Sequence, residues 1–226
     1  MLRTAFAIFR KDLCMSFAHG AGIAQALLLG LLLVFLFSLS LDTGDKLSPQ
    51  AAAAMFWLAS AFCQVLAFNM IYAYEESDKA RLGLLMLPAP PQAVWLGKAA
   101  AGGLILVCAQ CVFIPAVFVF LGQSLSSAWT AALAGIALGD IGMAALGSLL
   151  GALSVGQSGR ESLLSIVLFP LLIPLLLAGV RLTALGIDPF PAMQDMPHWA
   201  GLAAAFDSVF IAAGLLLFPF VYSGED

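Results

Sequence analysis

The stretch AAAGGLILVCAQCVFIPAVFVFLGQSLSSAWTAALAGIALG, residues 99–139, contains no charged side chain. A membrane-spanning helix needs about 20 residues, so this stretch is too long for one span. Within it, residues 122–129 read GQSLSSAW. Glycine and serine favour a turn, and tryptophan is enriched at the membrane surface. The stretch therefore predicts two helices, at about 99–121 and 127–155, with Trp129 near the membrane surface.

The composition of the whole chain agrees with a lipid environment. Of 226 residues, 62% are hydrophobic and 10% are charged. Soluble domains carry about 25% charged residues, and a soluble core could not hide this much apolar surface. The net charge of −4 argues against a nucleic-acid partner.

Runs of apolar residues predict six spans in one membrane domain, 1–226. They lie at about 20–41, 51–74, 99–121, 127–155, 162–180 and 199–222. A backbone in lipid must satisfy its own hydrogen bonds, and the alternation of a transmembrane β-barrel is absent. We therefore expect an all-α membrane protein with six transmembrane helices.

The distribution of Lys and Arg predicts the orientation, because cytoplasmic loops carry an excess of these residues. If the N-terminus is cytoplasmic, seven fall on the cytoplasmic side: Arg3, Arg10, Lys11, Lys79, Arg81, Lys98 and Arg160. Only Lys46 and Arg181 fall outside. Both termini are therefore expected in the cytoplasm, and Lys98 is expected where the chain re-enters the membrane.

Residues 2–18 precede the first span and show a helical period. Apolar residues recur every three or four positions, at Leu2, Phe6, Phe9, Leu13 and Phe17, and the basic residues lie off that stripe. The pattern predicts an amphipathic helix lying flat at the cytoplasmic interface, with a bend at His19-Gly20. The alternative is a continuation of the first span. The apolar run is longer than a signal-peptide core, so we expect this segment to be retained.

Two carboxylates and a glycine row stand out within the predicted spans. Gly135, Gly139, Gly147 and Gly151 share one helical face, which would let another helix approach closely. Asp140 follows this row, where we expect it to be buried between helices, either protonated or hydrogen-bonded to Ser or Gln. Packing and transport roles are both open for it. Asp207 is expected at a water-accessible position near the outer face.

No enzymatic or metal-binding constellation is evident. A P-loop motif is absent, and His19 and His198 fall on opposite sides of the predicted membrane. Cys108 and Cys111 form a C-x-x-C inside a span; we interpret them as small apolar residues, with a redox role as the alternative. His198 is expected to anchor at the membrane surface with Trp199; the alternative is an approach to a haem-like ligand. No catalytic residue or metal ligand is predicted.

The segment 75–91 joins the second and third spans and is charged, then apolar, then rich in proline. It favours a short amphipathic helix that ends before three prolines and docks against a cytoplasmic partner. The alternative is a solvated interfacial loop. The candidate partner-binding residues are Glu76, Asp78, Leu82, Leu84, Leu85, Met86 and Pro88.

Four stretches resemble the haem exporter protein B (CcmB) family, in matching order along nearly the whole chain. They are AIFRKDLCMSFAHGAGIAQALLL at 7–29, LLMLPAPPQAVWLGKAAAG at 84–102, VGQSGRESLLSIVLFPLLIPLLLAGV at 155–180 and LFPFVY at 217–222. The chain departs from the family at residues 78–82, which read DKARL where the family has Asp-Gly-Ser/Thr-Leu-Glu. The tryptophan-rich signature of the related haem-handling proteins is also absent.

The resemblance implies a six-helix fold of the ABC-2 permease type in the bacterial inner membrane. It also implies an ATPase partner (CcmA-like), a haem-handling subunit (CcmC-like) and a small membrane subunit (CcmD-like), with two copies of this chain in the complex. Residues 75–91 would then be the coupling segment and 2–18 the interfacial elbow helix. ATP would act through the partner, and haem would be a cargo rather than a bound cofactor.

The expected function is that of a non-catalytic, permease-type subunit of an ATP-driven complex for cytochrome c maturation. It would take part in haem export or in release of a haem-loaded chaperone at the periplasmic face. One alternative is an ABC-2 exporter subunit for lipid, polysaccharide or drug. Another is a scaffold that converts ATPase motion into chaperone release without transport.

The charge bias gives a topology prediction. In a cysteine-free background, Gly44→Cys should react with a membrane-impermeant thiol reagent added outside the cytoplasmic membrane, and Ala80→Cys should not. The reason is that Lys and Arg retain their loops on the cytoplasmic side. The inverse labelling pattern would show that the predicted orientation is wrong.

Overall fold

A computed structural model describes residues 1–18, 20–40, 47–77, 89–154 and 160–223. At the helix ends 75–77, 160–165 and 223, only the backbone is described. The described chain is helical, and six of its helices are long and apolar enough to cross a membrane. The predicted all-α fold with six spans is confirmed. The side on which the termini lie stays a prediction.

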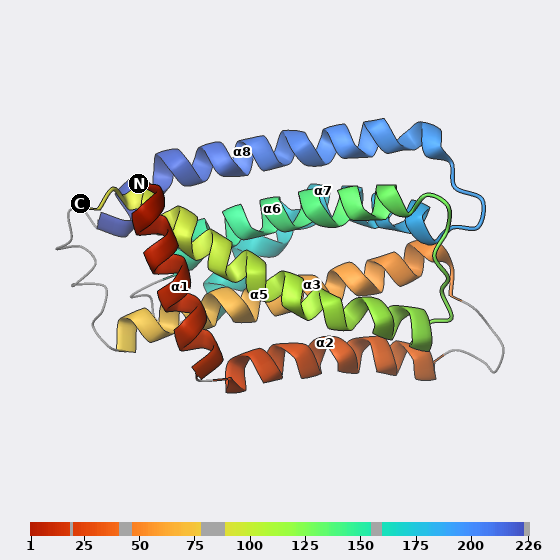
Figure 1. Ribbon diagram of the computed structural model, residues 1–226, viewed down its shortest axis with the longest axis horizontal. Helices are drawn as coiled ribbons and strands as arrows, with labels where there is room; N and C mark the ends of the chain where they lie inside the picture. The colour runs from red at the N-terminus through yellow and green to blue at the C-terminus, as the bar shows by residue number, and fades with distance from the viewer. Residues whose placement is uncertain (19, 41–46, 78–88, 155–159, 224–226) are drawn as a thin grey trace.

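An N-terminal helix precedes the six long ones. The elements are α1 (Leu2–Ala18), α2 (Ala21–Leu39), α3 (Pro49–Ser77), α5 (Pro91–Phe120), α6 (Trp129–Leu153), α7 (Arg160–Ile187), the 3-10 helix η1 (Met193–Asp195) and α8 (Met196–Ser223). The six long helices run side by side along the long axis of the molecule, and both termini lie at the same end (Figure 1). An even number of spans requires this arrangement of the termini.

The helix α1 is separate from the first span, and it crosses the bundle steeply near the end that holds both termini (Figure 1). It packs mainly against α5, through Ala5, Ile8, Asp12 and Ser16. Gly97 of α5 permits this contact, because a Cβ there would lie 2.7 Å from the carbonyl oxygen of Ala5. Of the predicted apolar stripe, Leu2, Phe6 and Phe17 are exposed, whereas Phe9 and Leu13 are partly buried against the core. The three exposed side chains are therefore free to contact lipid.

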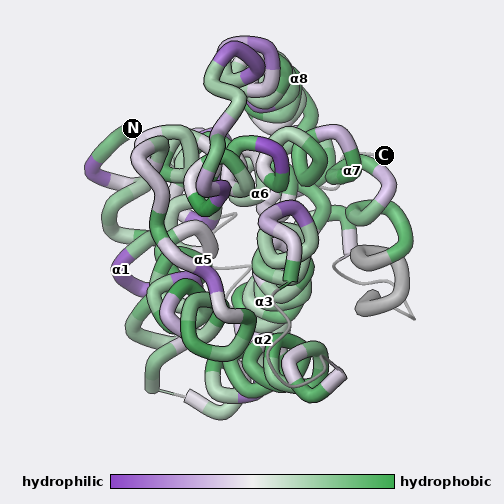
Figure 2. Tube along the Cα trace, turned by 90° about the vertical axis from the view of Figure 1, so that its right-hand side faces the viewer, coloured by the Kyte–Doolittle hydropathy of each residue, from purple (hydrophilic) through white to green (hydrophobic). Residues whose placement is uncertain are grey.

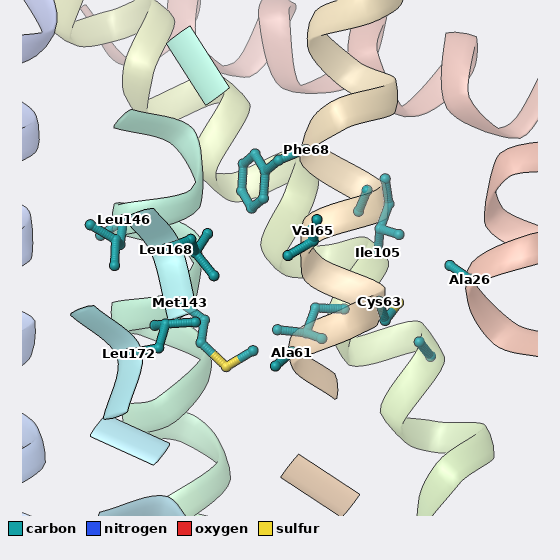
Figure 3. Packing of buried hydrophobic residues seen from close by; sticks show 14 of the residues in the cluster. Ala26, Ala61, Cys63, Val65, Phe68, Ile105, Met143, Leu146, Leu168 and Leu172 are labelled. Atoms are coloured by element: carbon teal, nitrogen blue, oxygen red, sulfur yellow. The ribbon is translucent and has the colours of Figure 1, made fainter. Parts of the chain in front are cut away.

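The helices α3 and α6 form the centre of the bundle, whereas α2 is its most exposed span. In the most apolar window of each helix, 67% of α3 and 61% of α6 are buried, against 17% of α2. Viewed end-on, the spans are hydrophobic around most of their circumference, as expected of helices that face lipid on one side and protein on the other (Figure 2). Phe68 and Val65 of α3 point toward Met143 and Leu146 of α6 (Figure 3).

The glycine row of α6 accommodates bulky side chains of its neighbours. The positions where Gly139, Gly147 and Gly151 lack a Cβ are occupied by the rings of Trp57, Phe68 and Tyr72 of α3, respectively. At Gly135, a Cβ would lie 2.7 Å from the Cβ of Leu182 on α7. The row therefore sets how closely α6 approaches both α3 and α7.

Two helix boundaries differ from the expected ones. The helix α5 begins at Pro91 rather than near residue 99, because proline fits the first turn of a helix, where its missing N–H would have no intrahelical partner. The helix α7 continues to Ile187 rather than ending near residue 180. Arginine is compatible with a helix, so Arg181 does not end α7, and its guanidinium lies 5.5 Å from the ring centre of Trp199.

The glycine row generates a stability prediction. Gly139→Leu or Gly147→Leu should lower the thermal unfolding temperature of the purified protein and reduce its yield, because the aromatic rings of α3 leave no room for a side chain. Overpacking a core typically lowers the free energy of unfolding by about 1–3 kcal/mol. Gly201→Leu on α8 is the matched control, since a Cβ there would meet nothing within 4 Å. Equal stability of all three variants would contradict the packing role of the row.

Candidate functional site

The predicted coupling residues fall at the edge of the described chain. Asp78, Leu82, Leu84, Leu85, Met86 and Pro88 lie outside the described residues. The backbone of Glu76 belongs to the last turn of α3, and its side chain is not described. The structure does describe the two helices that this segment joins, which are the C-terminal end of α3 and the N-terminal end of α5. We call these two packed helix ends, which the segment connects, the platform.

A buried ion pair joins α1 to α5 at this platform. Lys98 Nζ lies 3.4 Å from Asp12 Oδ2, and the side chains are 0% and 3% exposed. Lys98 also lies 4.5 Å from the ring centre of Tyr72 on α3. Lys11 Nζ approaches the other carboxylate oxygen of Asp12 at 2.8 Å, with a side chain that is 33% exposed. The carboxylate of Asp12 therefore pairs with two cations, the buried Lys98 of α5 and the partly solvated Lys11 of α1.

Lys98 lies two turns inside α5, which begins at Pro91, and it is buried between helices. Its expected place at the re-entry into the membrane stays a prediction. Burial of an unpaired charge would be costly, and Asp12 together with the face of Tyr72 makes it tolerable. Sequence reasoning missed this pair because its partners are 86 residues apart. One sequence signal could have indicated that Asp12 is buried: its helical spacing places it on the same face of α1 as Ala5, Ile8 and Ser16.

A chain of hydrogen bonds extends from this platform into α6. Tyr72 Oη donates to the carbonyl oxygen of Ser148 at 2.7 Å. Ser148 Oγ donates to the carbonyl oxygen of Trp95 at 3.1 Å, and Trp95 Nε1 donates to that of Ala145 at 3.3 Å. Together with the ion pair, these bonds tie α1, α3, α5 and α6 into one unit. A force applied between α3 and α5 would therefore also be transmitted to α6.

A second group of polar side chains lies near the middle of the spans. Asp140 of α6 is 8% exposed, and Gln110 Nε2 of α5 donates to its Oδ1 at 2.7 Å. The same nitrogen lies 3.3 Å from Ser60 Oγ of α3. Gln64 Nε2 of α3 donates to the carbonyl oxygen of Met143. The structure thus places Asp140 between helices with a glutamine partner, as the sequence predicted.

The position of Asp207 corrects the expectation of a water-accessible carboxylate. Asp207 is 5% exposed, and neither of its carboxylate oxygens has a hydrogen-bond partner among the described residues. Its Oδ1 occupies the space beside Gly142 of α6, close to Leu175 of α7. Because α8 begins at Met196, Asp207 lies about 16 Å along that helix of 28 residues. The inward face of α8, marked by Ala203, Phe210 and Phe218, also contains it.

The remaining candidate residues do not converge on a site in the described chain. Cys108 and Cys111 are exposed on α5 as free thiols, and Cys63 is a buried free thiol in α3. The His198 ring packs edge-on against Trp199, with 5.1 Å between ring centres. His19 lies outside the described residues. Within the described ranges, no group of three or more His, Cys, Asp or Glu is arranged to hold a metal ion.

Comparison with known families identifies the class of protein. Residues 3–223 match the family described as "CcmB protein". The match covers nearly the whole chain, including α1 and all six spans. The chain therefore belongs to the CcmB family, as its sequence motifs predicted. Family membership and six apolar helices together define a multi-pass inner-membrane protein.

Individual relatives are similar at moderate identity. The chain is 33% identical to "Heme exporter protein B" of Escherichia coli (strain K12) over 94 residues, which cover 42% of this chain and 43% of that protein. It thus matches less than half the length of that relative. It is 26% identical to the proteins of the same name from Haemophilus influenzae and Paracoccus denitrificans, over 80% and 83% of this chain and 82% and 87% of those proteins.

The platform generates a prediction about the buried ion pair. A double-mutant cycle with Asp12→Leu and Lys98→Met should give an interaction energy of about 0.5–3 kcal/mol in the free energy of unfolding. The pair is buried, so its charges are poorly screened. The same cycle with Lys11→Met should give about 0.2–1 kcal/mol, because solvent reaches the Lys11 side chain. Denaturant titration in detergent micelles measures the interaction energies of both cycles. A larger energy for the Lys11 cycle would show that the buried Asp12–Lys98 pair is not the stronger of the two interactions.

Proposed function

We propose that this chain is the permease-type membrane subunit of an ATP-driven complex for cytochrome c maturation. In this proposal it takes part in haem export, or in release of a haem-loaded chaperone, at the periplasmic face. The observation that carries the proposal is the family match over residues 3–223. The names of the three relatives, each a heme exporter protein B, support the choice of cargo.

The described structure supports a coupling role for the end of the bundle that holds the termini. The segment 75–91 leaves α3 and enters α5, and α1 is fastened to α5 beside it through Asp12 and Lys98. In the proposed mechanism an ATPase subunit moves this segment. The ends of α3 and α5 follow as one unit, because α1 and the Tyr72–Ser148–Trp95 hydrogen bonds hold them together. The displacement then reaches α6 through Gln64 and Gln110.

The proposal assigns nucleotide chemistry to other chains. ATP is bound and hydrolysed by a CcmA-like subunit, and a CcmC-like subunit handles haem together with a small CcmD-like subunit. Two copies of this chain are proposed in the complex, and the broad exposed face of α2 offers surface for lipid or for such neighbours. Haem is treated as a cargo, and no residue of this chain is assigned as its ligand.

Co-purification in mild detergent tests the choice of complex. A haem-handling subunit and pigment that remain with the chain support the cytochrome c maturation complex. An ATPase alone would instead support an exporter subunit for lipid, polysaccharide or drug. Transport measured in reconstituted vesicles then separates a permease from a scaffold that releases a chaperone without moving haem.

Coupling through residues 75–91 gives a further prediction. Replacing Leu85 and Met86 by Ser should release the ATPase subunit in a pull-down and abolish stimulated ATP turnover. Each buried apolar side chain contributes about 1.5–3 kcal/mol to such an interface, whereas an exposed ion pair contributes about 0–1 kcal/mol. Apolar residues should therefore dominate the affinity.

Replacing Lys79 and Arg81 by Gln is the matched control. This change should weaken the ATPase interaction less, and more visibly at low ionic strength, because salt screens exposed charges. Both double variants should insert normally, since neither touches a span. Retention of the ATPase at the wild-type level by the Leu85 and Met86 variant would show that the segment is a solvated loop.

A further inference from the structure

A groove runs between α1 and α5, near the end of the bundle that holds both termini. Its cavity volume is about 390 Å³. The lining residues are apolar, and they include Leu2, Phe6 and Phe9 of α1 and Leu96 and Ala100 of α5. Leu2 and Phe6 are 78% and 64% exposed, so the groove opens outward. Because its described lining has no polar side chain, an apolar chain can fill it without loss of hydrogen bonds.

The walls of the groove are held in place by contacts within the protein. Lys98 Nζ of α5 lies 3.4 Å from Asp12 Oδ2 of α1. At Gly97 of α5, a Cβ would lie 2.7 Å from the carbonyl oxygen of Ala5 and 2.9 Å from the Cβ of Ile8. The shape of the groove is therefore set by the protein itself, and such pre-organisation lowers the cost of binding.

Two arginines of α1 border the groove. Arg3 and Arg10 are three and four residues from Phe6, which places both beside this lining residue on the helix surface. They are seven residues apart, which is about 10 Å, or two turns, along the same side of α1. Both are exposed, and neither forms an ion pair within the part of the chain that the structure describes. Asp12 is 3% exposed, so the charges that solvent reaches on α1 are all basic.

The apolar groove and the arginines together define the chemistry of the occupant. Exposed guanidinium groups bind phosphate through paired hydrogen bonds. Beyond the groove, exposed apolar side chains continue along α5, at Leu104 and Val107. From Leu96 to Val107 the helix spans about 16 Å, which is roughly half the thickness of the hydrocarbon core of a bilayer. A phospholipid presents a phosphate and, beside it, apolar chains that reach the middle of the bilayer.

We infer that the groove between α1 and α5 binds one anionic phospholipid, with its phosphate on Arg3 and Arg10 and one acyl chain in the groove and along α5. A zwitterionic headgroup carries an ammonium group beside its phosphate, and the exposed side chains of α1 offer that cation no carboxylate. The apolar walls accept the chains of any phospholipid, so selectivity for the headgroup comes from the arginines. The inference does not depend on the proposed coupling to an ATPase, because this chain alone forms the site.

Competition between two lipids tests the inference on the purified full-length chain. The protein in mild detergent is incubated with an equimolar mixture of dioleoyl phosphatidylglycerol, which is anionic, and dioleoyl phosphatidylcholine, which is zwitterionic. Native mass spectrometry measures the ratio of the two one-lipid complexes. Each basic residue near an anionic lipid surface contributes about fivefold to binding, which corresponds to about 1 kcal/mol. With two arginines, the phosphatidylglycerol complex should therefore be about fivefold to thirtyfold more abundant.

Arginine variants separate a defined site from general electrostatic attraction. Arg3→Gln combined with Arg10→Gln should lower the ratio by about fivefold or more. Lys79→Gln combined with Arg81→Gln removes the same charge outside α1, and this matched control should change the ratio by less than about twofold, because neither residue borders the groove. If the Arg3 and Arg10 variant does not fold, Arg10→Gln alone should still lower the ratio by about twofold to fivefold.

A second pair of variants tests the apolar part of the site. Ala100→Phe fills the groove from an exposed position on α5, so it should reduce retention of both lipids. Ala24→Phe, at an exposed position on α2, is the matched control and should leave retention of both lipids unchanged.

Several outcomes would overturn the inference. Equal retention of the two lipids by the wild type would do so, as would an unchanged ratio in the Arg3 and Arg10 variant. An equal fall of the ratio in the Lys79 and Arg81 variant would show general attraction rather than a site. Failure to retain either lipid would also contradict it, and self-association that Ala100→Phe abolishes would then assign the groove to a second copy of the chain.

Discussion

The contact between α3 and α6 is the interaction on which the rest of this structure depends. Lipid tails are as apolar as leucine, so no hydrophobic driving force holds spanning helices together, and close packing must do so. Three aromatic rings of α3 occupy the places where α6 has glycine. Trp57 extends this contact to α7, because its Nε1 donates to Thr183 Oγ1 at 3.0 Å. The remaining spans pack around this pair.

Close approach of the helices also explains where polar groups are tolerated. The absence of a side chain at Gly147 brings Gln64 to the backbone of α6, and the absence of one at Gly142 leaves space for the carboxylate of Asp207. Polar atoms in lipid are costly unless they are buried in protein or satisfied there. The polar residues Gln64, Gln110, Asp140 and Asp207 therefore gather around α6, the helix with the most glycine in its packing faces.

The two ends of the bundle differ in chemistry. At the end with the termini, a buried ion pair and a cation–π contact fasten the amphipathic helix α1 to the spans. At the opposite end, Arg181 packs on Trp199 beside Asp188 and Asp195. A membrane subunit that receives motion from a partner on one side needs a rigid attachment there. The platform around Lys98 has that property, and it supports the coupling role proposed for residues 75–91.

The sequence by itself determined the number of spans, the separate N-terminal helix and the family, because hydropathy, helical period and local motifs are properties of contiguous residues. It also identified the glycine row, whose spacing lies within one helix. Only the tertiary structure decided that Lys98 is buried against Asp12, that Asp207 is enclosed beside Gly142, and that Asp140 accepts a hydrogen bond from Gln110. These environments are created by helices far apart in the chain. A lysine or an aspartate near the end of an apolar run has the same local pattern whether it faces water or a partner helix, so packing alone distinguishes the two.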